Sequence, residues 1–317
     1  MQTAQTDNLA YVPPGNLAGA PTDNLAYIPT GNLALHEVTS TDVDSHKTRI
    51  SLKKSASIEI LPSQVTDQRI LQFATGTQVY LPQLPGSSMD DSLKAVEIIT
   101  RNRLAATPHL AARSVPSPEA LDSWLGALTE LGCHRIFLIA GDPNQQSGPY
   151  KDSLQLLESG LLEKHGIKHI GVAGHPDGHE HVDTIKLKDA LAQKRAYAAA
   201  HGVDMWVVTQ FMFDIPLLSR WLNDWDESLA NLPVHVGIAG PTNMITLLRY
   251  ASRCGVSASA KVLAKNPASM KLLGSWNPDG QMDEIEQRCG DKIGERIGGI
   301  HLFPFGGLKK TAGWLEE

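Results

Sequence analysis

Two acidic residues of this sequence follow or interrupt short apolar runs, where a carboxyl group can do acid–base chemistry. Glu59 lies inside the run 56–61, and Asp142 follows Gly141 directly after the run 135–140. A carboxyl group buried among apolar side chains has a raised pKa, and a general acid needs this property. Glu59 is therefore a candidate general acid, with a structural ion pair as the competing interpretation. Asp142 is either a site residue or the cap of a turn.

A histidine-rich loop and a terminal glutamine are candidate binding groups. His175, His179 and His181 lie close together, but no cysteine or second carboxylate completes a recognisable set of metal ligands. A ligand-binding loop rich in hydrogen-bond donors is the favoured interpretation, and we expect no bound metal. Gln210 ends the run 205–211, and its amide both donates and accepts, which suits a heterocyclic amide such as a pterin.

Three further residues have a structural and a functional interpretation each. His109 follows a proline within an apolar run, where a satisfied core histidine is the commoner case. Lys194 and Arg195 lie on a helical segment after the histidine loop. They either form a solvated helix face or anchor a phosphate group.

Eight short apolar or β-branched runs alternate with segments of helical periodicity. The predicted strands are 56–61, 77–81, 104–110, 135–140, 169–173, 205–211, 234–238 and 299–303. Predicted helical segments include 117–131, 150–164 and 183–200, and 244–296 has room for several helices. This alternation predicts parallel pairing, and eight units in about 260 residues predict a (β/α)₈ TIM barrel with an N-terminal extension. In such barrels the candidate residues gather at the carboxyl ends of the strands.

Composition and motifs exclude several classes of function. The chain has 317 residues, 42% of them hydrophobic, and a net charge of -6, so a basic face for nucleic acid is not expected. Its three cysteines are far apart and are expected to be reduced thiols. No run approaches the ~18 apolar residues of a membrane span, and no secretory signal is evident, so we expect a cytoplasmic protein. Nucleophile and phosphate-loop motifs are missing, which favours cofactor chemistry.

The first 50 residues form a repeat-containing N-terminal arm, distinct from the catalytic barrel expected over 51–317. The segment DNLAYVPPGNLA from Asp7 recurs as DNLAYIPTGNLA from Asp23. Proline and glycine in each copy predict turns instead of helix. The arm is either a flexible surface segment or a device that docks on a neighbouring subunit of a homo-oligomer through the apolar residues Leu9, Tyr11, Leu25 and Tyr27.

The order of five short segments resembles the methylenetetrahydrofolate reductase family. They are EILP at 59–62, TPHL at 107–110, GD at 141–142, VAGHPDGH at 172–179 and VTQFMFD at 208–214. The likeness covers roughly residues 55 to 305. It implies a flavin-containing (β/α)₈ barrel that interconverts methylene- and methyl-tetrahydrofolate by hydride transfer through FAD, with NADH or NADPH as the electron partner.

The same resemblance implies roles for individual residues. Glu59 matches the acid that protonates the folate and opens its five-membered ring. Asp142 matches the aspartate that tunes the flavin and holds the pterin, and Gln210, with Phe211 beside it, matches the group that recognises the folate. The implied FAD contacts are His109, Gly141, Asp142, His175 and His179, with Lys194 or Arg195 at the phosphates.

The sequence departs from the family pattern at three places. Ala140 stands where an arginine is common, Leu81 where a threonine contacts the flavin, and 306–307 is a glycine pair where the family has Asn-Arg. These departures motivate an alternative, a non-redox or flavin-independent folate-binding barrel of one-carbon metabolism. A third hypothesis is a metal-dependent barrel hydrolase that uses His175, His179 and His301.

Overall fold

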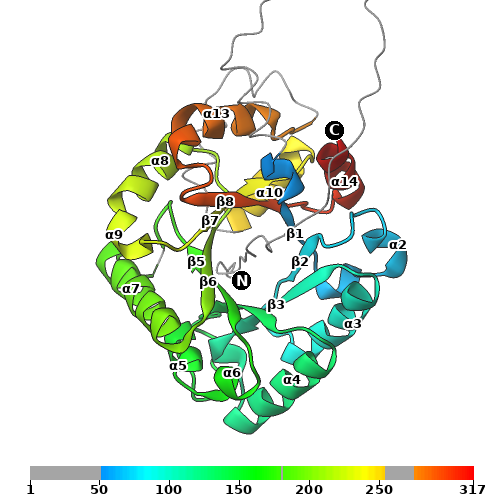
Figure 1. Cartoon of the computed structure of the whole chain (residues 1–317). Helices are drawn as coiled ribbons and strands as arrows, with labels where there is room; N and C mark the ends of the chain where they lie inside the picture. The colour runs from blue at the N-terminus through cyan, green and yellow to red at the C-terminus, as the bar shows by residue number, and fades with distance from the viewer. Residues whose placement is uncertain (1–50, 180, 254–274) are drawn as a thin grey trace, which may run out of the picture.

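A closed barrel of eight parallel strands forms the centre of the computed structural model, which describes residues 51–317 except 180 and 254–274. Each strand pairs with the next along the chain, and β8 pairs with β1 to close the ring (Figure 1). The (β/α)₈ prediction and all eight predicted strands are confirmed. The strands are β1 Ser57–Glu59, β2 Gln78–Leu81, β3 Ala105–Ala111, β4 Arg135–Ile139, β5 His169–Gly174, β6 Asp204–Thr209, β7 Val234–Ala239 and β8 Ile297–Phe303.

Helices form a ring around the strands, as Figure 1 shows in a view along the barrel. They are α2 Asp67–Ile70, α3 Leu93–Arg101, α4 Pro118–Glu130, α5 Ser153–Leu157, α6 Leu161–Lys164, α7 Thr184–His201, α8 Ile215–Asp224, α9 Asp226–Leu229, α10 Met244–Arg253, α13 Asp279–Cys289 and α14 Leu308–Glu316. None of them is both long and apolar enough to cross a membrane.

Local signals set several helix ends. The hydroxyl of Ser117 accepts a hydrogen bond from the amide of Ala120 at the start of α4, and Asp183 caps α7 in the same way. Gly202 ends α7 with φ 61°, a left-handed conformation that glycine adopts without strain. The predicted helices over 117–131 and 183–200 are therefore confirmed.

The helical segment predicted over 150–164 is confirmed only in part, because it forms two short helices with a turn between them. Asp152 caps α5, and the chain then turns through Gly160, whose φ of 73° interrupts helical geometry before α6 begins. Apolar spacing alone missed this break, because Gly160 leaves the helical periodicity of its neighbours unchanged.

Large aromatic side chains fill the interior of the barrel. Tyr80, Phe137 and Trp206 have no exposed surface. Gly171 on β5 makes room for two of them, since a Cβ there would lie 2.5 Å from the Trp206 ring and 2.6 Å from the Phe137 ring. The barrel is thus a packed core, and a ligand site has to lie at one of its ends.

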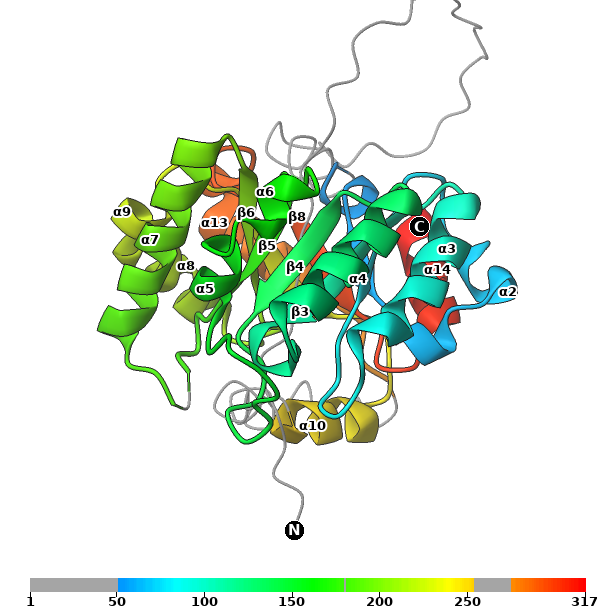
Figure 2. The same cartoon turned by 90° about the horizontal axis from the view of Figure 1, so that it is seen from below.

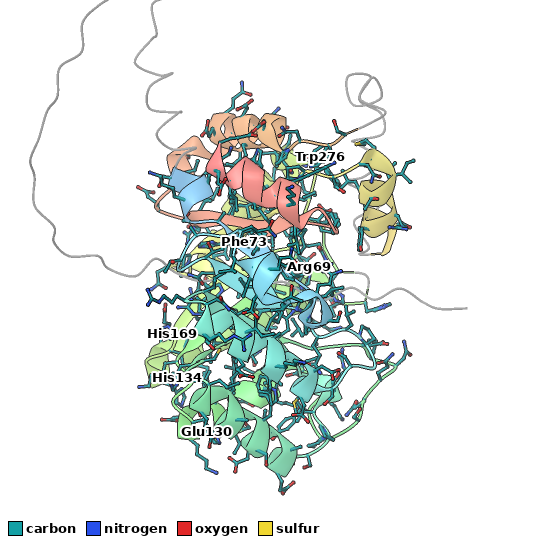
Figure 3. The ribbon with its side chains drawn as sticks, turned by 90° about the vertical axis from the view of Figure 1, so that its right-hand side faces the viewer. Arg69, Phe73, Glu130, His134, His169 and Trp276 are labelled. Carbon is teal, nitrogen blue, oxygen red and sulfur yellow. The ribbon has the colours of Figure 1, made fainter. Side chains whose placement is uncertain are left out.

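The two ends of the barrel differ. In Figure 2 the loops that follow β4 and β5 extend from the same end of the barrel across which α10 lies. In Figure 3 His134 and His169, at the starts of β4 and β5, lie at the opposite end from α10. The carboxyl ends of the strands therefore lie at the end of the barrel that carries these loops and α10. The N-terminal arm, with the proposed docking residues Leu9, Tyr11, Leu25 and Tyr27, lies outside the described residues.

Candidate functional site

A cavity of about 850 Å³ opens at the carboxyl ends of the strands, within the roughly 300–1,000 Å³ usual for ligand sites. It brings together most of the candidate residues, although they come from widely separated parts of the chain. Its lining includes Glu59, Gly141, Asp142, His175, His179, Lys194 and Gln210.

Glu59 is the last residue of β1, and its side chain keeps 18% exposure at the edge of the cavity. Its Oε2 atom is closed off from solvent and has no hydrogen-bond partner. This oxygen lies 3.9 Å from Nε2 of His109 and 3.9 Å from Nε2 of His301. Burial raises the pKa of the Glu59 carboxyl well above its ordinary value, so the group holds a proton that a ligand in the cavity can receive.

The two histidines beside Glu59 are neutral. Burial lowers the pKa of His109 to about 3, and burial, with the repulsion that a protonated His109 would exert, lowers the pKa of His301. Neither imidazole therefore supplies a cation that would ionise Glu59. His109 lies inside the barrel and is not part of the cavity lining, so the structure places it against the acid and not at the wall expected for a flavin contact.

Phe211 also lies away from the cavity wall. It is fully buried, with its ring centroid 5.3 Å from that of Phe303 and 4.8 Å from that of Phe305. It supports residues that do line the cavity, and a direct contact with a substrate would require it to move.

Asp142 fits both of its interpretations. Its Oδ1 accepts hydrogen bonds from the backbone and side-chain amides of Asn144, so it caps a turn, and it also lines the cavity. Gly141 before it has φ 80°, and a Cβ there would lie 3.1 Å from the Ala111 side chain. Glycine is thus required for the turn that aims Asp142.

Arg113 is a cavity residue that sequence reasoning missed. It lies in the 3₁₀ turn Ala112–Ser114 after β3, lines the cavity and donates a hydrogen bond from Nη1 to the Gly141 carbonyl. The β3–β4 register pairs Ala111 with Ile139, so Arg113 comes beside Gly141. It brings a positive charge to the turn after Ala140, where the family arginine is missing. Linear motif matching could not find it, because the charge comes from a neighbouring strand.

Gln210 is held at the cavity by tight backbone packing. The Thr209 hydroxyl accepts from the Gly237 amide at 2.9 Å, and a Cβ on Gly237 would lie 2.4 Å from the Thr209 carbonyl. The side-chain Oε1 of Gln210 accepts from the Phe211 amide at 3.2 Å. The carboxamide nitrogen therefore remains the atom of Gln210 best suited to recognise a ligand.

The departure at Leu81 also has a structural counterpart. Leu81 is buried within the hydrophobic core and does not line the cavity. Two residues further on, Gln83 lines the cavity, and its Oε1 accepts a hydrogen bond from the Ala111 amide at 2.9 Å. A polar side chain thus lies near the wall where the family threonine is absent.

Basic and imidazole side chains line the part of the cavity formed by α7 and the loop before it. Lys186 and Lys194 lie there, together with His175 and His179, whose ring centroids are 5.0 Å apart. Arg195 does not line the cavity, because its guanidinium donates to the Glu227 carbonyl at 2.7 Å. Of these two predicted phosphate contacts, only Lys194 lines the cavity, and its contact with a phosphate stays a prediction.

The metal-hydrolase hypothesis finds no support in the described residues. Among them, no group of three or more histidine, cysteine or acidic side chains is arranged to hold a metal ion. His175 and His179 line the cavity, whereas His301 is fully buried in β8 and is not part of the lining.

An aromatic wall borders the cavity after β8, and sequence reasoning did not identify it. Tyr250, Phe303 and Phe305 line this side, with the Tyr250 and Phe305 rings stacked at 4.5 Å and an angle of 23°. Phe305 has φ 46°, which is uncommon for a residue other than glycine. Trp276, labelled in Figure 3, braces the region by donating to the Ala239 carbonyl at 2.9 Å. Such a wall suits a flat heteroaromatic ligand.

Comparison with known proteins identifies the protein family of this chain. The model of the methylenetetrahydrofolate reductase family matches residues 76–270. The chain is similar to methylenetetrahydrofolate reductase (NADH) 1 of Arabidopsis thaliana, with 26% identity over 227 residues, 65% of this chain and 37% of that protein. It is also similar to methylenetetrahydrofolate reductase 1 of Schizosaccharomyces pombe, with 26% identity over 146 residues, 44% of this chain and 24% of that protein. These matches thus cover well under half the length of either relative.

Solved structures share the general architecture only. Tryptophan synthase from M. tuberculosis, in its aminoacrylate-bound form, aligns with a TM-score of 0.44 and 12% identity over 86% of this chain and 97% of that one. A 2,3-dimethylmalate lyase aligns with a TM-score of 0.43 and 11% identity over 86% of this chain and 84% of that one. The family match, in contrast, spans more than half of the chain. This protein belongs to the methylenetetrahydrofolate reductase family.

Proposed function

We propose that this protein interconverts 5,10-methylene- and 5-methyl-tetrahydrofolate by hydride transfer through FAD, with NADH or NADPH as the electron partner. The observation that carries the proposal is Glu59, a buried carboxyl with a raised pKa that opens into the same cavity as Asp142 and Gln210. A cyclic methylene bridge between two nitrogens opens only when one nitrogen is protonated, and Glu59 supplies that proton.

The cavity has groups that suit FAD, the cofactor typical of this family. Arg113, Lys186 and Lys194 would face its diphosphate, and His175 and His179 would donate hydrogen bonds. Gly141 lines the cavity, and its left-handed turn brings Asp142 to the same wall. When bound, FAD supplies the hydride transfer, and the protein supplies binding, orientation and the proton.

Three residues of the chain provide the proton, stabilise the charge of the intermediate and position the substrate. Glu59 gives its proton to the folate nitrogen that leaves the methylene carbon, and that carbon–nitrogen bond breaks. The substrate then carries a positive charge, which the Asp142 carboxylate at the same cavity stabilises. The Gln210 carboxamide donates to the pterin and holds it in position. The reverse reaction returns the proton to Glu59.

A substitution at Glu59 separates the two half-reactions. Glu59→Gln keeps the size of the side chain but has no proton to give. We expect folate reduction to slow by about 10²–10⁴-fold, while flavin reduction by the nicotinamide keeps its rate. Stopped-flow absorbance of the flavin band under anaerobic conditions measures both. Glu130→Gln is the matched control, because Glu130 is exposed on α4, away from the cavity lining (Figure 3). Equal losses in both half-reactions would contradict the role of Glu59.

Ala140 and Leu81 favour one alternative, a folate-binding barrel without flavin. Both replace residues that the family uses near the cofactor. A purified protein that binds tetrahydrofolate, stays colourless with added FAD and transfers no hydride to it would support this alternative. A flavin band that bleaches with methyltetrahydrofolate would exclude it.

A further inference from the structure

Three buried polar side chains meet Glu59 at the floor of the cavity. Ser57 and Glu59 come from β1, His109 from β3 and His301 from β8. The β1–β8 register places Ser57 opposite His301, and Ser57, His109 and His301 are each at most 1% exposed. The proposed mechanism uses only Glu59, so the other three polar groups need an explanation.

Ser57 determines which nitrogen of His301 carries the proton. Its Oγ lies 2.8 Å from Nδ1 of His301 and 3.5 Å from the Ile300 carbonyl. The single hydroxyl proton can go to Nδ1, or it can go to the Ile300 carbonyl while Nδ1–H donates to the hydroxyl. An O–H···O separation of 3.5 Å is longer than the usual range for such a bond, which favours donation to Nδ1. With the hydroxyl donating to Nδ1, the ring proton of His301 lies on Nε2.

The proton on Nε2 faces one particular oxygen of Glu59. Nε2 lies 3.9 Å from Oε2, the oxygen that is closed off from solvent. The side chain as a whole keeps 18% exposure, so Oε1 is the oxygen that a ligand in the cavity reaches. A separation of 3.9 Å is longer than a hydrogen bond, and a carboxyl movement of about 1 Å would form one, as catalytic groups often do when substrate binds.

We propose that Ser57 and His301 are positioning residues, which make Oε2 of Glu59 the acceptor oxygen and so keep its acidic proton on Oε1, facing the substrate. This inference rests on the proposed role of Glu59 as the acid. A carboxyl group has two oxygens, and only the one that faces the cavity can deliver a proton. An N–H group beside the buried oxygen selects between them.

The surrounding groups leave Glu59 as the one carboxyl in the described part of this cluster. Tyr80 on β2 lies edge-on to His301 at 4.7 Å and to His109 at 6.3 Å. His235 on β7 lies near enough for the charge of His301 to lower its pKa further, after burial. Asp142 lies at the cavity side. Burial lowers the pKa values of all three histidines and raises that of Glu59, so a protonation change in this cluster above the ordinary range of a carboxyl belongs to Glu59.

The first test needs neither folate nor flavin. Nitrogen-15 NMR of the folded full-length chain reports which ring nitrogen of His301 is protonated. We expect the proton on Nε2, and a mixture of the two tautomers in Ser57→Ala. A proton on Nδ1 in the unsubstituted protein would overturn the proposal. Because the measurement does not depend on turnover, its result tests the positioning role whether or not the proposed function is correct.

The second test titrates Glu59 in three chains. The infrared band of its protonated carboxyl group, identified by its loss in Glu59→Gln, is followed against pH. A donor to the carboxylate favours the charged form, so His301→Leu should raise the midpoint by about one pH unit. His301→Gln keeps an N–H donor and should restore the midpoint. An unchanged midpoint in His301→Leu would refute the role of His301, and Ser57→Ala tests the same contact with a smaller deletion.

A third measurement connects the arrangement to chemistry. In Ser57→Ala we expect slower folate reduction with unchanged folate affinity and unchanged flavin reduction by the nicotinamide. Slower folate reduction accompanied by weaker folate binding would indicate a general structural defect and contradict the proposal. If the unsubstituted protein reduces no folate, the proposed function fails while the tautomer result still stands.

Discussion

Acidification should destabilise this protein through the histidines buried in its barrel, and His109 gives the magnitude. Burial lowers its pKa from an ordinary 6.5 to about 3. The folded chain therefore keeps the imidazole neutral, whereas the unfolded chain protonates it below pH 6.5. A lowered folded-state pKa contributes stability that is present above 6.5 and is lost as the pH falls toward about 3.

Each pH unit in this window costs about 1.4 kcal/mol per histidine. Between pH 7 and pH 5, His109 alone removes about 2 kcal/mol from the free energy of unfolding. Burial lowers the pKa values of His235 and His301 in the same direction, so these two histidines add to the loss. Glu59 acts oppositely, because its raised pKa makes the folded state more stable as the pH falls. The loss from His109 alone is a sizeable part of an ordinary stability of about 5–15 kcal/mol.

The assay is urea unfolding at the two pH values, compared between the unsubstituted protein and His109→Gln. The substitution removes one of the three imidazoles, so the loss of stability on acidification should shrink by about 2 kcal/mol. His134→Gln is the control, since His134 is exposed at the opposite end of the barrel (Figure 3) and its substitution should leave the loss unchanged. An equal loss in His109→Gln and the unsubstituted protein would show that His109 is charged in the folded state and would refute the reasoning.

Three further outcomes follow from the packing and charge of the site. Arg113→Gln should weaken FAD binding about tenfold while the melting temperature changes little, as measured by titration of flavin fluorescence, and unchanged affinity would remove Arg113 from the cofactor site. Gly237→Ala should destabilise the protein by about 1–3 kcal/mol and displace Gln210, because the new Cβ meets backbone, whereas Gly280→Ala, with open space around it, should be neutral or slightly stabilising in the same thermal unfolding assay. Ser117→Ala should cost about 1 kcal/mol in denaturant unfolding through loss of the α4 cap, and a value near zero would show that the Ala120 amide finds another partner.

Strand order and the main site residues were predictable because they depend on local patterns. A short apolar or β-branched run marks each strand in the sequence, and several polar residues that end or follow these runs line the cavity at one end of the barrel. Glu59, Asp142 and Gln210 were found in this way, and the cavity unites them.

The missed residues depend on contacts between strands. Arg113 reaches Gly141 only because β3 and β4 pair in one register, and the chain order contains no sign of that contact. The aromatic wall of Tyr250 and Phe305 likewise joins segments from after β7 and after β8. Arg195, in contrast, was a candidate that does not line the cavity. Adjacent residues on a helix point in different directions, and of this pair only Lys194 faces the cavity.

The aromatic plug formed by Tyr80, Phe137 and Trp206 has a kinetic consequence. These side chains are fully buried and fill the inside of the barrel, so a ligand that reaches Glu59 enters and leaves at the carboxyl end. Under the proposed function, the nicotinamide donor and the folate therefore use the same entrance and bind one after the other. Double-reciprocal plots for the two substrates should be parallel lines, and an excess of either substrate should inhibit competitively against the other.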